Sequence, residues 1–461
     1  MKPKVFMVLF LIFSGWMPLA QAEAVGENEP GGLSQYYAEV LAYYPALKSQ
    51  HANIEAAFAE KLAAYGLLLP SVSGAVQVDV TDDPAAVFSH KLKQEAFTAG
   101  DFAVDSLNSP RHRTNWHWTL EAQMPLFNGF QTITAIQSSA LLAKSVQLQE
   151  KLTRQEAFLL ALEAYLNSAI SKTVLQSAKA ITTDAEQDLK QADELKAKGM
   201  ILGADFYAAK VLNAALLQQM HRLETAQDMS VIAANLLRGM MPQLPFEPSV
   251  IFKEQIFDST DLNAWLGEAY ANRLDLKAIE AAIDARRKEV FRAKTSALPK
   301  IKGFGAVSED TRDWRTGGEN FMLGVKGEMP IFDPAYAARV RKAKAELKKL
   351  EAERWALKDR ITQKVSQTHL TRQALAKDYQ VVLQAFEDAK EAVRLTESLY
   401  REGRKSIVDV MEMRQALLAS EMRARELGMQ AELYLVNLQF FSGTLDEEAI
   451  QNTIHRIDGL S

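Results

Sequence analysis

Four short segments alternate between apolar and polar residues, which is the pattern of a β-strand with one apolar face. Trp116 and Trp118 stand on the apolar side of the second segment, Met322 is an exception in the fourth, and Phe304 does not fit the weaker third. About ten residues can span a bilayer as a tilted strand, so these segments are long enough to be transmembrane. The expected strands lie at about 71–80, 115–124, 300–308 and 320–329.

Two long segments carry a helical pattern instead. Between Leu148 and Leu195, apolar residues recur with a period close to 3.6. A helix from about Gln131 to Lys198 extends roughly 100 Å at 1.5 Å per residue. No globular core is that thick, so such helices must pack in a bundle or a coiled-coil tube. The expected helices are two long ones at about 131–198 and 334–402, and two return helices at about 204–238 and 407–441.

The two halves of the chain repeat the same order of motifs. "QMPLFNGF" at 123–130 and "EMPIFDPA" at 328–335 each follow a strand and precede a long helix, and "KGMILGADF" echoes "EGRKSIVDV" farther on. Such self-similarity indicates a duplicated unit. We expect repeat 1 at 23–240, a proline-rich connector at 241–260, repeat 2 at 261–445 and a C-terminal tail at 446–461. The 24 extra residues in the first half, including "FSHKLKQEAFTAGDFAVDSLNSP", are expected to lengthen an outer loop.

The first 22 residues read as a signal peptide. Lys2 and Lys4 precede an apolar run from Val5 to Phe13, and Ala20-Gln21-Ala22 fits a small-x-small cleavage site. A transmembrane anchor would need about 20 apolar residues, so we expect export. The chain has no cysteine, which excludes thiol catalysis, disulfides and a lipid-modified N-terminal cysteine. A net charge of −5 does not indicate a nucleic-acid partner.

Two hairpins supply four strands per chain, whereas single-chain membrane barrels have at least about eight. Open sheet edges are not tolerated in lipid, so a membrane barrel would be shared between chains. Two chains would give eight strands and three would give twelve. A wide pore and closed cyclic symmetry favour three. The alternative is a soluble sheet on a periplasmic coiled-coil scaffold without a pore.

The paired motifs "QMPLFNG" and "EMPIFDP", the segment "EGRKSIVDV" and the later "NLQFFSGTL" resemble the TolC family of outer-membrane efflux and secretion channels. The resemblance covers about Leu33 to Leu445. It implies a mainly α-helical chain with transmembrane β-strands, arranged as two helix–strand–strand–long helix–helix repeats. It also implies a homotrimer sharing a 12-strand β-barrel, a long α-helical tunnel and an equatorial region that holds the connector.

The resemblance further implies a passive exit duct in the outer membrane for small molecules. Its partners would be outer-membrane lipid, a periplasmic adaptor (a membrane fusion protein) and an inner-membrane pump of the resistance–nodulation–division or ABC type. Type I protein secretion is the alternative role. The seven histidines show no metal-site spacing, and His112 and His117 are expected in a loop and at the barrel mouth. We therefore expect no enzyme activity, metal or cofactor.

The turns between the long and return helices are expected at the far tips of the helical hairpins, where glycine ends a helix. By resemblance these tips contact the adaptor, although plain connecting turns would have the same glycines. The tip residues are Gly199, Met200, Gly403, Arg404 and Ser406.

Asp409 and Glu412 share a helical face, so three chains would form two stacked acidic rings. The resemblance places a periplasmic gate there, although Ser406 and Asp409 also form a capping-box pattern. It also implies a gate lock in which Tyr400 donates to Asp205. In that lock Lys405 replaces an arginine and faces Ala204, so its contact is weaker.

The repeated motif is expected at the junction between barrel and tunnel. Proline would end each strand, Asn128 or Asp333 would cap the following helix, and aromatic rings would lie at the membrane interface. The junction residues are Pro125, Phe127, Pro330 and Phe332.

Overall fold

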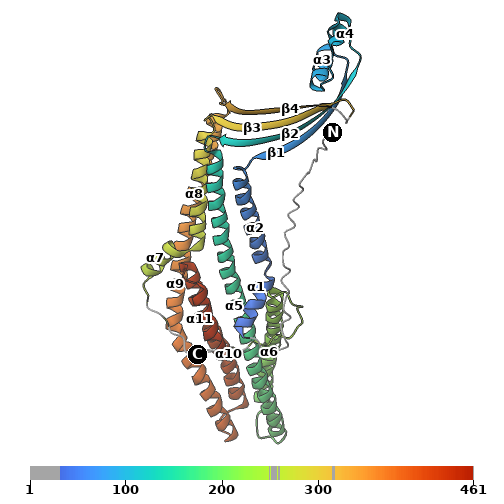
Figure 1. Cartoon of the computed structure of the whole chain (residues 1–461). Coiled ribbons are helices and arrows are strands. Elements are labelled where there is room, and N and C mark those ends of the chain that lie inside the picture. Colours follow the sequence, from blue (N-terminus) through green and yellow to red (C-terminus); the bar gives the residue numbers. More distant parts are fainter. Residues whose placement is uncertain (1–31, 249, 251–256, 258–259, 314–316, 460–461) are drawn as a thin grey trace.

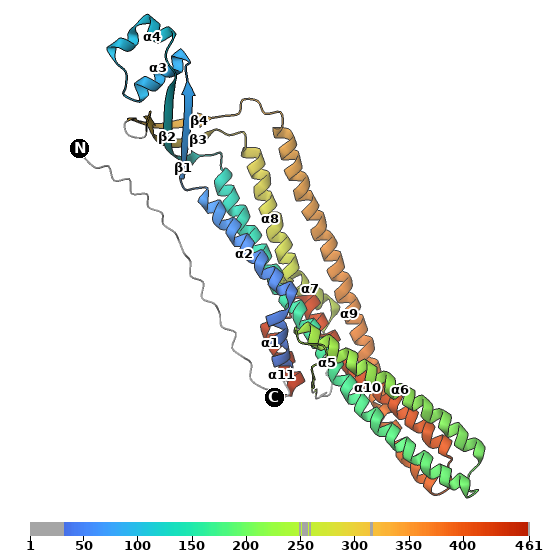
Figure 2. The same cartoon turned by 90° about the vertical axis from the view of Figure 1, so that its right-hand side faces the viewer.

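The computed structural model describes residues 32–248, 250, 257, 260–313 and 317–459. The chain is elongated, with one β-sheet at one end and two helical hairpins reaching away from it (Figures 1 and 2). The expected signal peptide, and residues 249, 251–256 and 258–259 of the expected connector, lie outside the described residues.

Helices dominate the chain. The helices are α1 Leu33–Tyr43, α2 Pro45–Gly66, α3 Pro84–Lys93, η1 Ala99–Phe102 (a 3₁₀ helix), α4 Val104–Asn108, α5 Gln131–Ala197, α6 Gly203–Leu237, α7 Leu262–Asn272, α8 Leu274–Thr295, α9 Tyr336–Arg401, α10 Ile407–Ser442 and α11 Glu447–Asp458. The strands are β1 Ser71–Thr81, β2 Arg113–Phe127, β3 Lys300–Thr311 and β4 Gly317–Glu328. No helix in the described part of the chain is both long and apolar enough to cross a membrane.

The four strands form one antiparallel sheet in the order β1-β2-β3-β4. The register places the apolar positions of all four strands on one face, since Val76 pairs with Trp118, and Val307 pairs with both Leu120 and Phe321. This apolar face is bare in the single chain, and Phe321 is 87% exposed.

Phe304 and Met322, the two exceptions to the alternating pattern, both lie on the opposite, polar face of the sheet. Phe304 lies on it directly opposite Gly324 in β4, and a side-chain carbon at Gly324 would collide with the Phe304 ring. The glycine therefore leaves room for the ring. Met322 lies on the same face, opposite Ala306.

The two junction motifs differ in structure. β2 continues to Phe127, and its register against β3 shifts between Pro125 and Phe127, as at a β-bulge. Proline therefore does not end β2, because a bulge absorbs the missing donor. In the second repeat β4 ends at Glu328, so Pro330 and Phe332 follow the strand.

The expected caps are also displaced. Phe130, with a left-handed φ of 63°, stands at the N-cap of α5, while Asn128 Oδ1 accepts from the Thr132 amide at 3.3 Å. Asp333 Oδ1 accepts from the Ala335 amide at 2.9 Å just before α9. Both side chains bond at the helix entrance without being the N-cap residue.

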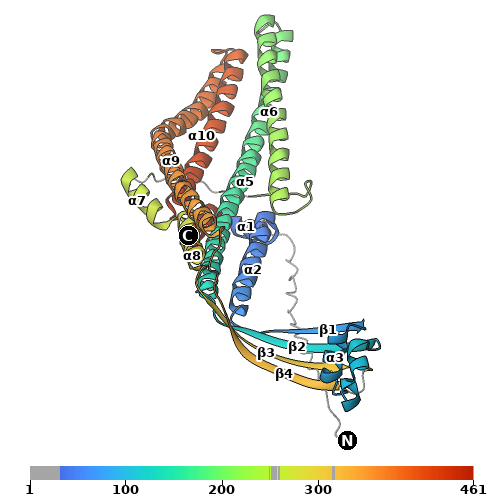
Figure 3. The same ribbon diagram turned by 90° about the horizontal axis from the view of Figure 1, so that it is seen from above.

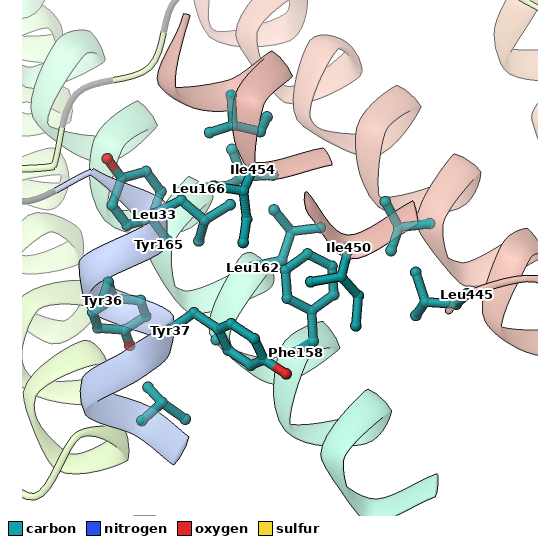
Figure 4. Close-up of a cluster of buried hydrophobic side chains, with 14 of the residues drawn as sticks. Leu33, Tyr36, Tyr37, Phe158, Leu162, Tyr165, Leu166, Leu445, Ile450 and Ile454 are labelled. Atoms are coloured by element: carbon teal, nitrogen blue, oxygen red, sulfur yellow. The ribbon is translucent and has the colours of Figure 1, made fainter. Parts of the chain in front are cut away.

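A core at mid-length joins both termini of the described chain (Figure 4). Tyr36 and Leu33 of α1 pack against Tyr165 of α5 and against Ile454 of α11. Asp458 Oδ1 accepts from the Leu33 amide at 2.6 Å and so caps α1 with the end of α11. The expected C-terminal tail thus contains a packed helix.

The extra residues of the first half are not simply an extended loop. They fold into α3, η1 and α4 at the far end of the sheet, which Figure 3 shows from above.

Candidate functional site

The two hairpin tips have the same backbone geometry. Gly199 and Gly403 have φ of 71° and 72°, the left-handed region that glycine adopts without strain. The Met200 amide donates to Leu195 O, and the Arg404 amide donates to Leu399 O, each at 2.9 Å. This pattern is the Schellman helix end, and Met200 remains 69% exposed. Both tips reach the same end of the molecule (Figure 2).

A capping box starts α10 directly after the second tip. Asp409 Oδ2 accepts from the Ser406 amide at 2.8 Å and from Ser406 Oγ at 2.9 Å, and Ser406 Oγ accepts from the Asp409 amide. Lys405 Nζ donates to Asp409 Oδ1 at 3.0 Å. These bonds, led by that from the Ser406 amide, lower the pKa of the Asp409 carboxyl. Lys405 therefore pairs along its own chain segment, and in the described part of the chain it forms no hydrogen bond with Ala204.

The two predicted acidic-ring residues differ in environment. Asp409 is half-buried by its capping bonds, whereas Glu412 is exposed on α10. The capping role of Asp409 is thus visible in one chain. A ring would require other copies of the chain and stays a prediction.

The predicted lock between Tyr400 and Asp205 is not formed within the described chain. Tyr400 Oη is buried and has no hydrogen-bond partner among the described residues. Burial raises the pKa of the Tyr400 hydroxyl, and the negative charge of Asp188 adds to the rise. Asp205 lies in the first turn of α6. The lock stays a prediction for the assembled channel.

An ion-pair cluster around Arg414 joins the two hairpins near their tips. Arg414 of α10 is buried, with 6% of its side chain exposed, and contacts three carboxylates. Its Nη2 lies 2.7 Å from Asp188 Oδ2 and 2.8 Å from Glu397 Oε1, and its Nη1 lies 3.4 Å from Asp184 Oδ2. Arg414, Asp184, Asp188 and Glu397 are called the Arg414 cluster below.

The Arg414 cluster connects α10 to α5 of the other repeat and to α9. Apolar packing surrounds it, because Met411 and Leu418 of α10 lie in one buried cluster with Ala185 of α5. Guanidinium groups form geometrically specific bonds with carboxylates, and low exposure strengthens them. The cluster therefore holds the two hairpins of one chain together near their tips.

Sequence reasoning missed Arg414 because its two partners on α5, Asp188 and Asp184, lie 226 and 230 positions away along the chain. The available signal was an arginine on the buried stripe of α10, three residues after Met411. The described residues contain no group of three or more metal-binding side chains that could hold a metal ion.

Comparison with known proteins shows a fold similar to those of solved outer-membrane channels. Residues 265–444 match a family model described as outer membrane efflux protein. No curated protein matches the chain by sequence.

Three solved channels share the fold. CmeC of Campylobacter jejuni is 15% identical with a TM-score of 0.76, over 92% of this chain and 89% of its own. VceC of Vibrio cholerae is 15% identical with a TM-score of 0.72, over 89% and 96%. The outer membrane channel MtrE of Neisseria gonorrhoeae is 15% identical with a TM-score of 0.70, over 90% and 89%. The resemblance to TolC-like channels is confirmed, and so is the predicted fold of the single chain, which is mainly α-helical with a small antiparallel sheet.

Proposed function

We propose that this chain, which has a TolC-like fold and matches an outer membrane efflux protein model, forms a passive duct in the outer membrane. Three chains would share one 12-strand barrel and continue it as a helical tunnel. Small molecules would enter at the hairpin tips from an inner-membrane pump through a periplasmic adaptor and leave at the far end of the sheet.

The exposed apolar face of the sheet is the observation that carries this proposal. Phe321, Leu323 and Val325 of β4 are 87%, 84% and 67% exposed, and their neighbours across the sheet are apolar as well. A soluble monomer rarely leaves so continuous an apolar surface in water. β1 and β4 are also edge strands with unpaired backbone groups, which pairing with other copies would satisfy.

Adjacent residues of β4 provide a matched test of the lipid-facing side. Leu323 lies on the apolar face and Met322 on the polar face. Arginine on the lipid face of a barrel costs about 2–4 kcal/mol near the bilayer midplane. We expect Leu323→Arg to lose the detergent-resistant, heat-modifiable trimer, and Met322→Arg to keep it.

The wild-type protein is then placed in planar lipid bilayers. Ion conductance from a detergent-extracted trimer is the expected result. A soluble, non-conducting monomer would contradict the duct and support the periplasmic scaffold.

The adaptor contact can be tested at the tips, because the natural chain has no cysteine. A single cysteine at Met200 or Arg404, coupled to a photo-crosslinker in cells, should capture the adaptor. Met229 on α6 is 65% exposed and away from the tips, so Met229→Cys is the control. Equal capture at all three positions would argue against a tip-specific contact. Identifying the pump that is recovered together with the crosslinked adaptor would distinguish small-molecule efflux from type I protein secretion.

A further inference from the structure

Residues 82–112, between β1 and β2, form a small folded unit that we call the cap. Phe97 stacks edge-on against Phe88 and Phe102, with ring centroids 4.9 and 5.0 Å apart. Lys91 Nζ donates to Asp101 Oδ1 at 2.6 Å. This bond, together with bonds from Thr98, lowers the pKa of Asp101 to about 2. The cap thus has a defined internal structure of its own.

The cap crosses the whole sheet on its polar face. It leaves β1, and α3 packs against β2, β3 and β4. A side-chain carbon at Gly318 of β4 would collide with the carbonyl oxygen of Lys93 at the end of α3. Gly318 pairs with Asp310, and Asp310 pairs with His117, so this contact is on the polar face. Three strand spacings of about 4.8 Å correspond to a path of roughly 14 Å.

A buried polar network pins the cap to that face. Gln94 Nε2 donates to Asn115 Oδ1 at 2.7 Å, and Asn115 Nδ2 donates to Asp310 Oδ1 at 2.7 Å. Arg113 Nε donates to Gln94 Oε1 at 2.7 Å. Gln94 and Asp310 are 5% and 1% exposed. Buried polar side chains with paired partners fix one arrangement, because leaving any of them unpaired is costly.

We propose that the cap is a second constriction of the channel, at the outer mouth and separate from the hairpin tips. The inference rests on the proposed function, in which the polar face lines the lumen. Each cap crosses the inner surface of all four strands of its own chain. Three caps therefore line the whole inner circumference of the mouth and limit the size of the solute that passes.

The test uses a single cysteine as a reporter inside the barrel. Glu121 lies on the polar face of β2, farther from the outer end than His117, so Glu121→Cys places a thiol below the cap. A small membrane-impermeant methanethiosulfonate and a bulky polyethylene-glycol maleimide are added to intact cells. We expect rapid labelling by the small reagent and slow labelling by the bulky one.

Two glycines of β4 provide a variant that disturbs the cap and a control that changes only the strand. Gly318→Ala pushes against Lys93 O, whereas Gly327→Ala meets nothing within 4 Å. Gly318→Ala should raise the rate of bulky labelling about tenfold, the change that about 1.4 kcal/mol produces. Gly327→Ala should leave the rate unchanged. Gln94→Ala, which removes the central side chain of the network, should act like Gly318→Ala and serves if that variant does not assemble.

The outcomes separate the two proposals. If the small reagent fails to label the cysteine from outside, the polar face is not an open lumen, and the duct and the cap constriction both fall. If the small reagent labels it and neither cap variant changes bulky labelling, the duct stands and the cap constriction is wrong.

Discussion

Arg414→Gln should separate the two helical hairpins of each chain near their tips. Glutamine keeps a polar side chain of moderate length but removes the charge that Asp188 and Glu397 share. Removing one partner of a buried ion pair costs about 3–5 kcal/mol. The lower end applies here, because the two carboxylates keep 19% and 25% exposure and regain water when the hairpins part.

About 3 kcal/mol corresponds to roughly a hundredfold shift in the equilibrium between joined and separated hairpins. If separation widens the periplasmic end, the trimer in a planar lipid bilayer should spend far more time in a high-conductance state. Arg423→Gln is the matched control, since Arg423 lies on the same helix and pairs with Glu426 at the surface. A surface pair of this kind contributes little, so its currents should match the wild type.

A double-mutant cycle with Glu397→Gln isolates the interaction. Substitutions within one ion-pair network have non-additive effects, so the increase in conductance of the double variant should be smaller than the sum of the increases of the two single variants. Currents of Arg414→Gln that equal those of the wild type, from a trimer of normal heat-modifiable migration, would refute the clamp. Full additivity would show that Arg414 acts without Glu397.

The remaining predictions concern the tips and the gate. Gly403→Ala forces a left-handed residue at about 1 kcal/mol and should weaken adaptor crosslinking, whereas Gly203→Ala, where φ is not positive, should not. Asp409→Ala should raise hydrogen exchange in the first turn of α10 at neutral pH. Because folding lowers the pKa of Asp409 below its usual 3.8, its stabilisation is present above that pH and lost as pH falls through the lowered value, so the difference from wild type should vanish in acid. If the Tyr400–Asp205 lock forms in the assembled channel, Tyr400→Phe should raise conductance; an unchanged current would remove the lock.

Periodicity was sufficient for the fold because both signals were long. The alternation of β2 and the helical stripe of α5 persist over many residues, so a local exception could not conceal them. The position of Phe304 on the polar face could not be predicted, because it depends on Gly324 lying opposite in β4. The sequence of a single strand does not determine its register against a neighbour. The short helices of the cap were hidden for a related reason, since α3 is held by contacts with distant strands.

In the candidate site too, local features could be predicted from the sequence and long-range contacts could not. The glycines at the tips and the Ser406 capping box were predictable, because both are local backbone devices. The Arg414 cluster was not, because Arg414 of α10 and Asp188 of α5 are close only after these two helices, of 36 and 67 residues, have packed side by side. The resemblance suggested a lock through Tyr400, whereas among the described residues Arg414 forms ion pairs that join the two repeats.

The near-equal lengths of the two hairpins constrain how this protein can evolve. α5 and α9 have 67 and 66 residues, and α6 and α10 have 35 and 36. Each residue adds about 1.5 Å, so inserting seven residues into one long helix alone would displace its tip by about 10 Å relative to the other. A lineage can therefore lengthen or shorten this helical extension only by matched changes in both hairpins, so insertions and deletions in one hairpin are coupled to those in the other.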